Sequence, residues 1–239
     1  MSKLISVQEL HVVSLNTGNG QKVQILLEEL KEIYGVGCNS VVHTSVASWA
    51  AEPKPEWFLA LNANGMIPVI VDHSESPPFV LSESCAELLY LVRKFDSRGI
   101  LSFRDDIEYS QCLQWLFFWQ GHLYLAVRHF SPDTSPIVIK HFKKEIFRAL
   151  GVLETHLSNN HNGHAREYIA GSFPGRYSIA DISIWPMVNV FLGARNIKAE
   201  MDQNCPSLLL WCKRIEKRTA VQLGISKKWD QDQDAEACV

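Results

Sequence analysis

The first third of the chain alternates short apolar runs with one longer run of helical spacing. These short runs predict buried strands at residues 11–15 and 38–44. Between them, residues 21–34 carry apolar side chains three and four positions apart, which predicts an amphipathic helix that ends at Gly35. Residues 16–20, rich in Asn and Gly, predict a turn before this helix. We therefore predict a βαβ unit with parallel strands and a right-handed crossover.

Smaller elements follow this unit. Pro55 is well placed to open a short helix that runs to residue 61. Apolar runs predict two strands at residues 67–71 and 79–82, joined as a hairpin, and then a helix at residues 86–95. The predicted order of elements, β-α-β-α-β-β-α, is the order of a thioredoxin-like domain.

Strand signals stop after Asp96. Residues 97–104 are a short polar linker, and long runs of helical spacing follow it. The helical runs cover residues 105–128, 136–157, 179–192 and 206–218. The predicted fold class is therefore α/β plus all-α, with an α/β domain at residues 1–96, an all-helical domain at 105–226 and a polar tail at 227–239.

Composition and charge narrow the function classes. The formal net charge of −3 gives no strong field to attract nucleic acid or anionic lipid. Residues 1–9 lack the apolar stretch of a signal peptide, and no run approaches the ~18 apolar residues of a membrane span. We expect a cytoplasmic protein without nucleic-acid or membrane partners. The six cysteines include no C-x-x-C pair, so neither a disulfide framework nor a metal site is expected.

The strongest chemical signal is the segment NGMIP at residues 64–68. Proline removes a backbone donor at the mouth of the predicted strand. This is reasonable if the bond between Ile67 and Pro68 is cis and leaves the Ile67 backbone to an extended peptide ligand. A plain edge-strand proline is the alternative interpretation.

The second signal is the pair Glu83 and Ser84, where a strand passes into a helix. Free N–H groups and the helix dipole at such a point favour a carboxylate. The Ser84 hydroxyl can add a hydrogen bond, and Glu83 can pair with an ammonium group. Together they suit the head group of an α-amino acid. The alternative is a helix cap, because residues 84–87 also fit the Ser-x-x-Glu capping box, and both interpretations can hold at once.

The third signal is the polar turn TGNGQK at residues 17–22. Its spacing excludes a phosphate-binding loop, and the missing third glycine excludes a dinucleotide-binding fingerprint. Thr17 and Asn19 remain as polar groups directed at a helix N-terminus, which is a suitable place to hold a thiolate.

Segments along nearly the whole chain resemble glutathione transferases, in particular the Nu-class and fungal nitrogen-regulator-like branch. They are NTGNGQKVQILLEEL, PEWFLALNANGMIPVIVDH, LSESCAELLYLVRKF, FKKEIFRALGVLE, YSIADISIWP and CPSLLLWCKRIEKRTAVQ. The resemblance implies a thioredoxin-like domain that binds glutathione, followed by a helical bundle. It also implies glutathione as co-substrate, an electrophilic small molecule as second substrate, no metal, and a homodimer.

The same resemblance assigns roles to single residues. Asn19, or Thr17 two positions earlier, would face the glutathione sulfur as the catalytic group. Ile67, before the cis proline Pro68, would pair with the cysteinyl backbone, and the pair Glu83 and Ser84 would hold the γ-glutamyl head.

The chain also departs from the family pattern. Met66 stands where relatives often carry Lys or Arg, and the turn is T-G-N-G rather than T-P-N-G. Because the first predicted strand does not end in tyrosine and the turn holds no cysteine, we do not expect a tyrosine-type or an enzyme-disulfide mechanism at this turn.

The implied function is a glutathione transferase that activates the thiol for attack on an electrophile. Glutathione-dependent reduction of a disulfide or peroxide is a further possible reaction. Two alternatives stay open, namely a non-catalytic glutathione-binding regulator and a transferase dedicated to one fungal biosynthetic pathway rather than to detoxification.

Overall fold

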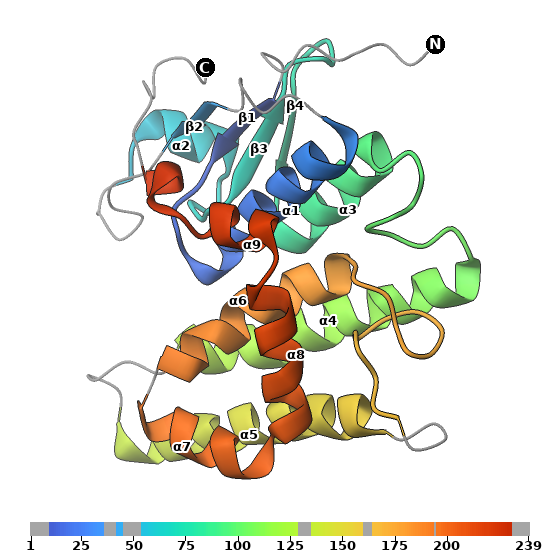
Figure 1. Cartoon of the computed structure of the whole chain (residues 1–239). Coiled ribbons are helices and arrows are strands. Elements are labelled where there is room, and N and C mark those ends of the chain that lie inside the picture. The colour runs from blue at the N-terminus through green and yellow to red at the C-terminus, as the bar shows by residue number, and fades with distance from the viewer. Residues whose placement is uncertain are drawn as a thin grey trace. The chain divides into compact units, whose positions relative to one another are not determined.

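The computed structural model describes residues 10–35, 42–44, 54–128, 135–159, 164–193 and 195–230. The chain divides into two compact units (Figure 1). The first contains Met1–Arg98 together with Arg218–Val239, and the second contains Gly99–Lys217. The predicted fold class, α/β followed by all-α, is confirmed by the elements of the two units. The predicted domain limits of 1–96 and 105–226 stay a prediction. In the structure, residues after 217 belong with the first unit.

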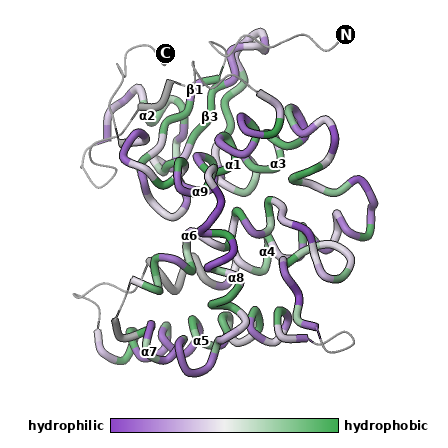
Figure 2. Tube along the Cα trace, in the orientation of Figure 1, coloured by the Kyte–Doolittle hydropathy of each residue, from purple (hydrophilic) through white to green (hydrophobic). Residues whose placement is uncertain are grey.

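The first unit contains a four-stranded sheet in the order β2-β1-β3-β4. Its strands are β1 (Leu10–Val13), β2 (Val42–Thr44), β3 (Val69–Asp72) and β4 (Phe79–Ser82). The predicted parallel pairing of β1 with β2 is confirmed, and β3 pairs antiparallel with both β1 and β4. β3 is buried at every position, and its apolar part appears in the hydrophobic colour in Figure 2. It begins after Pro68 rather than at Ile67, and predicted strand positions 38–41 lie outside the described residues.

The helices of the first unit follow its strands. They are α1 (Gly18–Tyr34), α2 (Glu56–Leu61), α3 (Ser84–Phe95), α9 (Thr219–Gly224) and the 3-10 helix η3 (Lys227–Asp230). The predicted turn at residues 16–20 is wrong in its second half, because α1 already begins at Gly18. Thr17 is its N-cap, and the Thr17 side chain accepts a hydrogen bond from the Gly20 backbone N–H at 3.2 Å. α1 ends at Gly35 as predicted, in the left-handed conformation that suits glycine.

The last described segment packs on α1, which the sequence did not predict. The Arg218 guanidinium forms two hydrogen bonds with the buried Glu29 carboxylate, at 2.6 and 2.8 Å. A Cβ atom added at Gly224 would lie 2.7 Å from the Cα atom of Ile25, so the two helices approach closely there. Trp229, in the predicted polar tail, is buried. Residues 227–230 are therefore part of the fold, and 231–239 lie outside the described residues.

The second unit is helical. Its helices are α4 (Asp106–Arg128), α5 (Pro136–Ser158), α6 (Ile179–Gly193), α7 (Arg195–Asn204) and α8 (Pro206–Glu216). α7 was not predicted, since its sequence is mostly polar. The Asp181 carboxylate ties the core together by accepting hydrogen bonds from the backbone N–H groups of Ile169 and Ser178 and from the Trp211 indole. Across the described residues, no helix is both long and apolar enough to span a bilayer.

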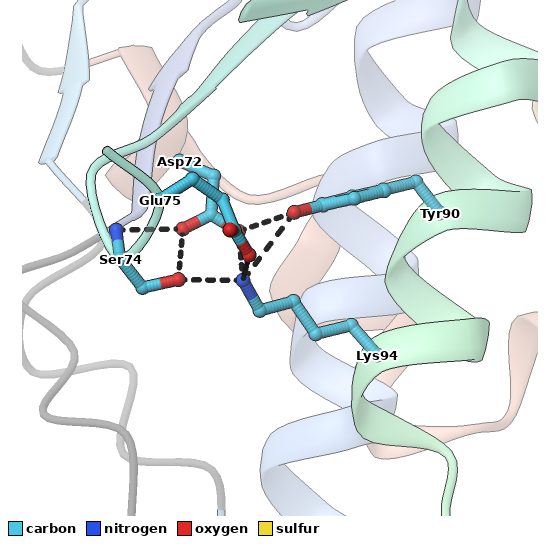
Figure 3. Close-up of polar contacts among 5 residues, drawn as sticks. All are labelled: Asp72, Ser74, Glu75, Tyr90 and Lys94. Atoms are coloured by element: carbon cyan, nitrogen blue, oxygen red, sulfur yellow. Dashed lines mark hydrogen bonds and ion pairs between the residues drawn. The ribbon is translucent and has the colours of Figure 1, made fainter. Parts of the chain in front are cut away.

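A polar network fastens the β3–β4 hairpin to the last turns of α3 (Figure 3). The buried Asp72 carboxylate forms an ion pair with Lys94 and accepts hydrogen bonds from the Tyr90 hydroxyl at 2.5 Å and the Ser74 hydroxyl at 2.6 Å. Lys94 also donates to Ser74 at 2.6 Å and lies 3.4 Å from Glu75. Burial raises the pKa of Asp72, but the hydrogen bonds from Lys94, Ser74 and Tyr90 outweigh it and hold that pKa below its ordinary value.

Replacing Lys94 by methionine should lower the free energy of unfolding by about 1–2 kcal/mol at neutral pH, because Asp72 keeps only its neutral donors. A carboxylate with a depressed pKa contributes stability above its unfolded pKa of ~3.9 and loses it as the pH falls through the folded value. The difference between wild type and Lys94→Met should therefore shrink below about pH 4. Denaturant unfolding across this pH range measures it, and a difference that does not change with pH would contradict the assignment.

Candidate functional site

Four of the predicted site residues, Thr17, Asn19, Glu83 and Ser84, lie where two helices begin. Asn19 lies in the first turn of α1, and Ser84 is the first residue of α3. The Ser84 hydroxyl lies 3.5 Å from the Asn19 side-chain oxygen, although 65 positions separate the two residues. Lys22, one turn along α1, places its ammonium nitrogen 3.4 Å from the same hydroxyl. The structure therefore brings the second and third sequence signals together.

Glu83 takes an unusual backbone conformation immediately before α3. Its φ angle is 76°, in the left-handed region that residues other than glycine rarely adopt. Such a conformation costs on the order of 1–3 kcal/mol and is typically held in place at functional sites. Glu83 occupies the N-cap position of α3 but makes no side-chain capping hydrogen bond.

The capping-box interpretation of residues 84–87 is wrong. Ser84 is the first helical residue rather than the N-cap, because Glu83 takes the cap position. Both carboxyl oxygens of Glu87 are buried without a hydrogen-bond partner among the described residues, so Glu87 does not reach back to close a box. The start of α3 consequently lacks a side-chain cap, which leaves a helix N-terminus suited to an anionic group.

Two buried ionisable residues near the start of α3, Lys22 and Glu87, were not predicted from the sequence as functional groups. Lys22 is 1% exposed and Glu87 is fully buried. Burial lowers the pKa of Lys22, and the nearby Cys85, Glu83 and Glu87 oppose that shift. Burial, with a smaller contribution from Glu83, raises the pKa of Glu87 well above its ordinary value, against the effect of Lys22. The signal that could have revealed them is their spacing, because each lies four positions before a buried leucine of its helix, Leu26 or Leu91.

The segment NGMIP, at residues 64–68, lies immediately before β3 in the first unit. The peptide bond between Ile67 and Pro68 is cis, as predicted. The Ile67 side chain packs with Val13, Phe58 and Val69 in a small apolar cluster. No hydrogen bond to the Ile67 backbone occurs within the described part of the chain. The pairing of that backbone with an extended ligand stays a prediction.

Lys54 is a basic residue that lies near Met66, the position where relatives often carry Lys or Arg. The stem of Lys54 lies against Gly65, in the turn before Met66, so closely that a Cβ atom at Gly65 would meet it. Gly65 has a φ angle of 60°, which also favours glycine there. Lys54 thus lies beside the NGMIP turn.

The second unit has a cavity of about 740 Å³ between the start of α4, the end of α5 and the loop that follows α5. Its lining includes Glu108, Trp115, His156 and Arg166, and none of the predicted site residues. Among residues that the structure describes, no group of three or more His, Cys, Asp or Glu side chains is arranged to hold a metal ion.

Comparison with known proteins gives a consistent set of relatives. No protein-family model matches the chain. It is 32% identical over 233 residues to the Escherichia coli disulfide-bond oxidoreductase YghU, covering 90% of this chain and 73% of the relative. A crystal structure of glutathione transferase YghU from Streptococcus pneumoniae, complexed with glutathione, matches with a TM-score of 0.78 and 29% identity over 92% of this chain and 83% of that one. The Phanerochaete chrysosporium transferase URE2P6, in complex with oxidized glutathione, matches with a TM-score of 0.74 and 26% identity over 93% and 96% of the two chains.

Proposed function

Because this chain belongs to the glutathione transferase family, in its Ure2p-like branch, we propose that it binds glutathione in its first unit and activates the glutathione thiol as a thiolate. The observation that carries the proposal is the adjacency of Asn19 and Ser84 at the starts of α1 and α3. Asn19 suits a thiolate and Ser84 suits a carboxylate. Their contact places the proposed thiolate site beside the proposed carboxylate site.

The proposed binding mode follows the extended shape of a tripeptide. The γ-glutamyl carboxylate would bind at the start of α3 and the Ser84 hydroxyl, and Glu83 would pair with the ammonium group. The Ile67 backbone, held beside Pro68, would pair with the cysteinyl residue. The glycyl end would depend on groups near Met66 and Lys54.

Asn19 and the start of α1 can together supply the free energy that is needed to ionise the thiol of bound glutathione. A thiol with an ordinary pKa of ~8.5 must lose about two units to be mostly ionised at neutral pH, which corresponds to roughly 2.7 kcal/mol. A hydrogen bond to a charged acceptor contributes ~1.5–3 kcal/mol, and a helix N-terminus adds ~0.3–2 kcal/mol. Asn19 and the first turn of α1 therefore suffice without a general base.

Thr17 is assigned the assisting role. Its side-chain oxygen accepts the Gly20 N–H as the helix N-cap. That bond fixes Thr17 at the start of α1, and the hydroxyl proton of Thr17 can still be donated to a neighbouring acceptor. Asn19 makes no cap bond of this kind, so we favour Asn19 as the group that faces the sulfur.

We propose two reactions for the activated thiolate. In transfer, the sulfur attacks an electrophilic carbon and forms a thioether as the leaving group departs with its electron pair. In disulfide reduction, the sulfur attacks one sulfur of a disulfide, forms a mixed disulfide with it and releases the other sulfur as a thiolate. A second glutathione thiolate then attacks the glutathione sulfur of the mixed disulfide, which releases the remaining thiolate and forms glutathione disulfide. The second reaction is supported by the oxidoreductase name of the E. coli relative and by the oxidized glutathione bound to the fungal one.

A kinetic screen tests this function. The protein would be supplied with glutathione and, in turn, an aryl halide, a peroxide and a mixed disulfide. Turnover of at least one above the uncatalysed rate is expected. Glutathione binding without turnover of any of them would favour the non-catalytic regulator instead.

Replacing Ser84 by alanine should weaken glutathione binding by about 1–3 kcal/mol, because the γ-glutamyl carboxylate loses a hydrogen bond and stays partly desolvated. Isothermal titration calorimetry measures the affinity directly. Ser207→Ala, at the start of α8 in the second unit, is a matched control that should leave the affinity unchanged. Wild-type affinity in Ser84→Ala would remove Ser84 from the site.

A homodimer in the cytoplasm is part of the same proposal. Large apolar side chains stay exposed on both units, including Phe79 and Val80 on β4 and Ile107 and Phe117 on α4. A partner subunit would cover such surface. Light scattering at micromolar concentration should give about twice the 27.1 kDa mass of the chain, and a mass equal to one chain would reject the pairing.

A further inference from the structure

We propose that Lys22 is a positioning residue, which sets the orientation of the Asn19 amide through the hydroxyl of Ser84. This inference rests on the glutathione function proposed above. It assigns to a buried lysine the task of turning the donor end of the Asn19 side chain toward the sulfur.

The direction of the hydrogen bonds follows from the chemistry of the three groups. The Lys22 ammonium lies 3.4 Å from the Ser84 hydroxyl oxygen, and that oxygen lies 3.5 Å from the Asn19 Oδ1 atom. An ammonium group can only donate, so the Ser84 oxygen accepts from Lys22. The single hydroxyl proton of Ser84 is then turned away from Lys22, and in the proposed complex Asn19 Oδ1 and the γ-glutamyl carboxylate share it as a three-centre hydrogen bond.

The orientation of Asn19 decides whether it can stabilise a thiolate. With Oδ1 turned to Ser84, the Asn19 NH₂ group is the end that can donate to sulfur. The reversed amide would present its oxygen, which accepts hydrogen bonds and repels a negative sulfur. Lys22 therefore favours the catalytically useful orientation of Asn19 without contacting glutathione itself.

The charge of Lys22 extends this effect beyond hydrogen-bond contact. Both distances, 3.4 and 3.5 Å, are longer than the ~2.5–3.2 Å that is usual for hydrogen bonds. A buried positive charge also attracts the negative end of the nearby Asn19 amide dipole, and this attraction is poorly screened because Lys22 is 1% exposed. The groups that face Lys22 from the start of α3 are Glu83, Cys85 and Glu87, and all three favour its charged form.

A purely structural role is the competing explanation. Lys22 could serve only to offset the charge of Glu83 and Glu87 inside the unit. In that case its loss would change stability or the binding of the head group, and the thiol would ionise as before. The two explanations differ in one measurable quantity, the pKa of the thiol in bound glutathione.

The experiment compares Lys22→Met with Lys31→Met, which removes the same charge from the last turn of the same helix. Ultraviolet thiolate absorbance gives the pKa of the bound thiol, and calorimetry with S-methylglutathione, which has no thiol to ionise, gives the affinity separately. We expect Lys22→Met to raise the thiol pKa by about one unit. Its affinity for S-methylglutathione should change less than roughly threefold, and Lys31→Met should change neither value.

Two further variants keep the proposal testable if Lys22→Met does not fold, which circular dichroism would show. Ser84→Ala breaks the same chain of hydrogen bonds and should raise the thiol pKa by about the same amount, whereas Ser84→Thr keeps the hydroxyl and should restore it. Where Lys22→Met does fold, adding it to Asn19→Ala should have no further effect on the thiol pKa, because the group that it orients is gone.

An unchanged thiol pKa in folded Lys22→Met, or in Ser84→Ala, would overturn the proposal. So would a loss of S-methylglutathione affinity in Lys22→Met without a shift in the thiol pKa. Failure of the proposed function itself would appear earlier and separately, as wild-type protein that does not bind glutathione or that leaves the thiol pKa at its free value.

Discussion

Replacing Asn19 by alanine is expected to raise the pKa of the thiol in bound glutathione by about one to two units. The reason is the loss of a hydrogen bond to a charged acceptor, worth ~1.5–3 kcal/mol, at 1.36 kcal/mol for each pKa unit. With a wild-type thiol pKa of about 6.5, the thiolate fraction at neutral pH, and with it the rate of any reaction limited by thiolate attack, should fall about threefold for a one-unit shift and about 25-fold for a two-unit shift. Titration of the ultraviolet thiolate absorbance in the complex measures the shift.

Asn204→Ala, in α7 of the second unit, is the control for this change. It removes an exposed asparagine that bonds only locally, to the Glu200 carbonyl, and should leave the thiol pKa unchanged. If Asn19→Ala also leaves it unchanged, the role passes to Thr17. Ser14 is less suitable, because it is fully buried and its hydroxyl oxygen accepts a 2.6 Å hydrogen bond from Gln24.

Replacing Arg218 by methionine should lower the free energy of unfolding by about 3 kcal/mol. Breaking a buried ion pair costs ~3–5 kcal/mol because the remaining charge stays buried without compensation. The Glu29 side chain is 0% exposed and the Arg218 side chain 32% exposed, so we expect the lower end of that range. Denaturant unfolding followed by circular dichroism measures the change.

Lys217→Met is the matched control, since it removes the same charge one position earlier, from an exposed side chain at the end of α8. It should change stability by no more than about 0.5 kcal/mol. Equal effects of the two substitutions would contradict the role given to the Arg218–Glu29 pair. The double variant Arg218→Met with Glu29→Gln should recover part of the loss, because no buried charge is left without a partner.

The sequence predicted most elements of the fold because apolar spacing is a local signal. α1 was predicted from its leucine and isoleucine positions, and the predicted strand at Phe79–Ser82 has the bounds seen in the structure. α9 was missed because six residues are too short to show a helical period. Its contacts with α1 include the Arg218–Glu29 pair, which joins positions 189 apart and leaves no local pattern.

Part of the candidate site could also be predicted, because its motifs are local signals in the sequence. Motifs identified Asn19, Ser84 and the cis bond before Pro68, and the structure adds that the first two lie together. The capping-box interpretation was wrong because Ser-x-x-Glu spacing does not determine the backbone conformation of the preceding residue. Glu83 has a positive φ and is itself the N-cap, one position before Ser84. The buried pair Lys22 and Glu87 depends on the packing of α1 against α3, which spacing along one helix does not determine.

The most direct test of glutathione activation is a pH titration of the wild-type protein saturated with glutathione, followed by the ultraviolet absorbance of the thiolate. The bound thiol is expected to ionise at least about one unit below the ordinary thiol pKa of ~8.5. A bound thiol that titrates at its free value would contradict the assignment of Asn19 and the start of α1 as the thiolate site, and absence of binding would contradict the glutathione site altogether.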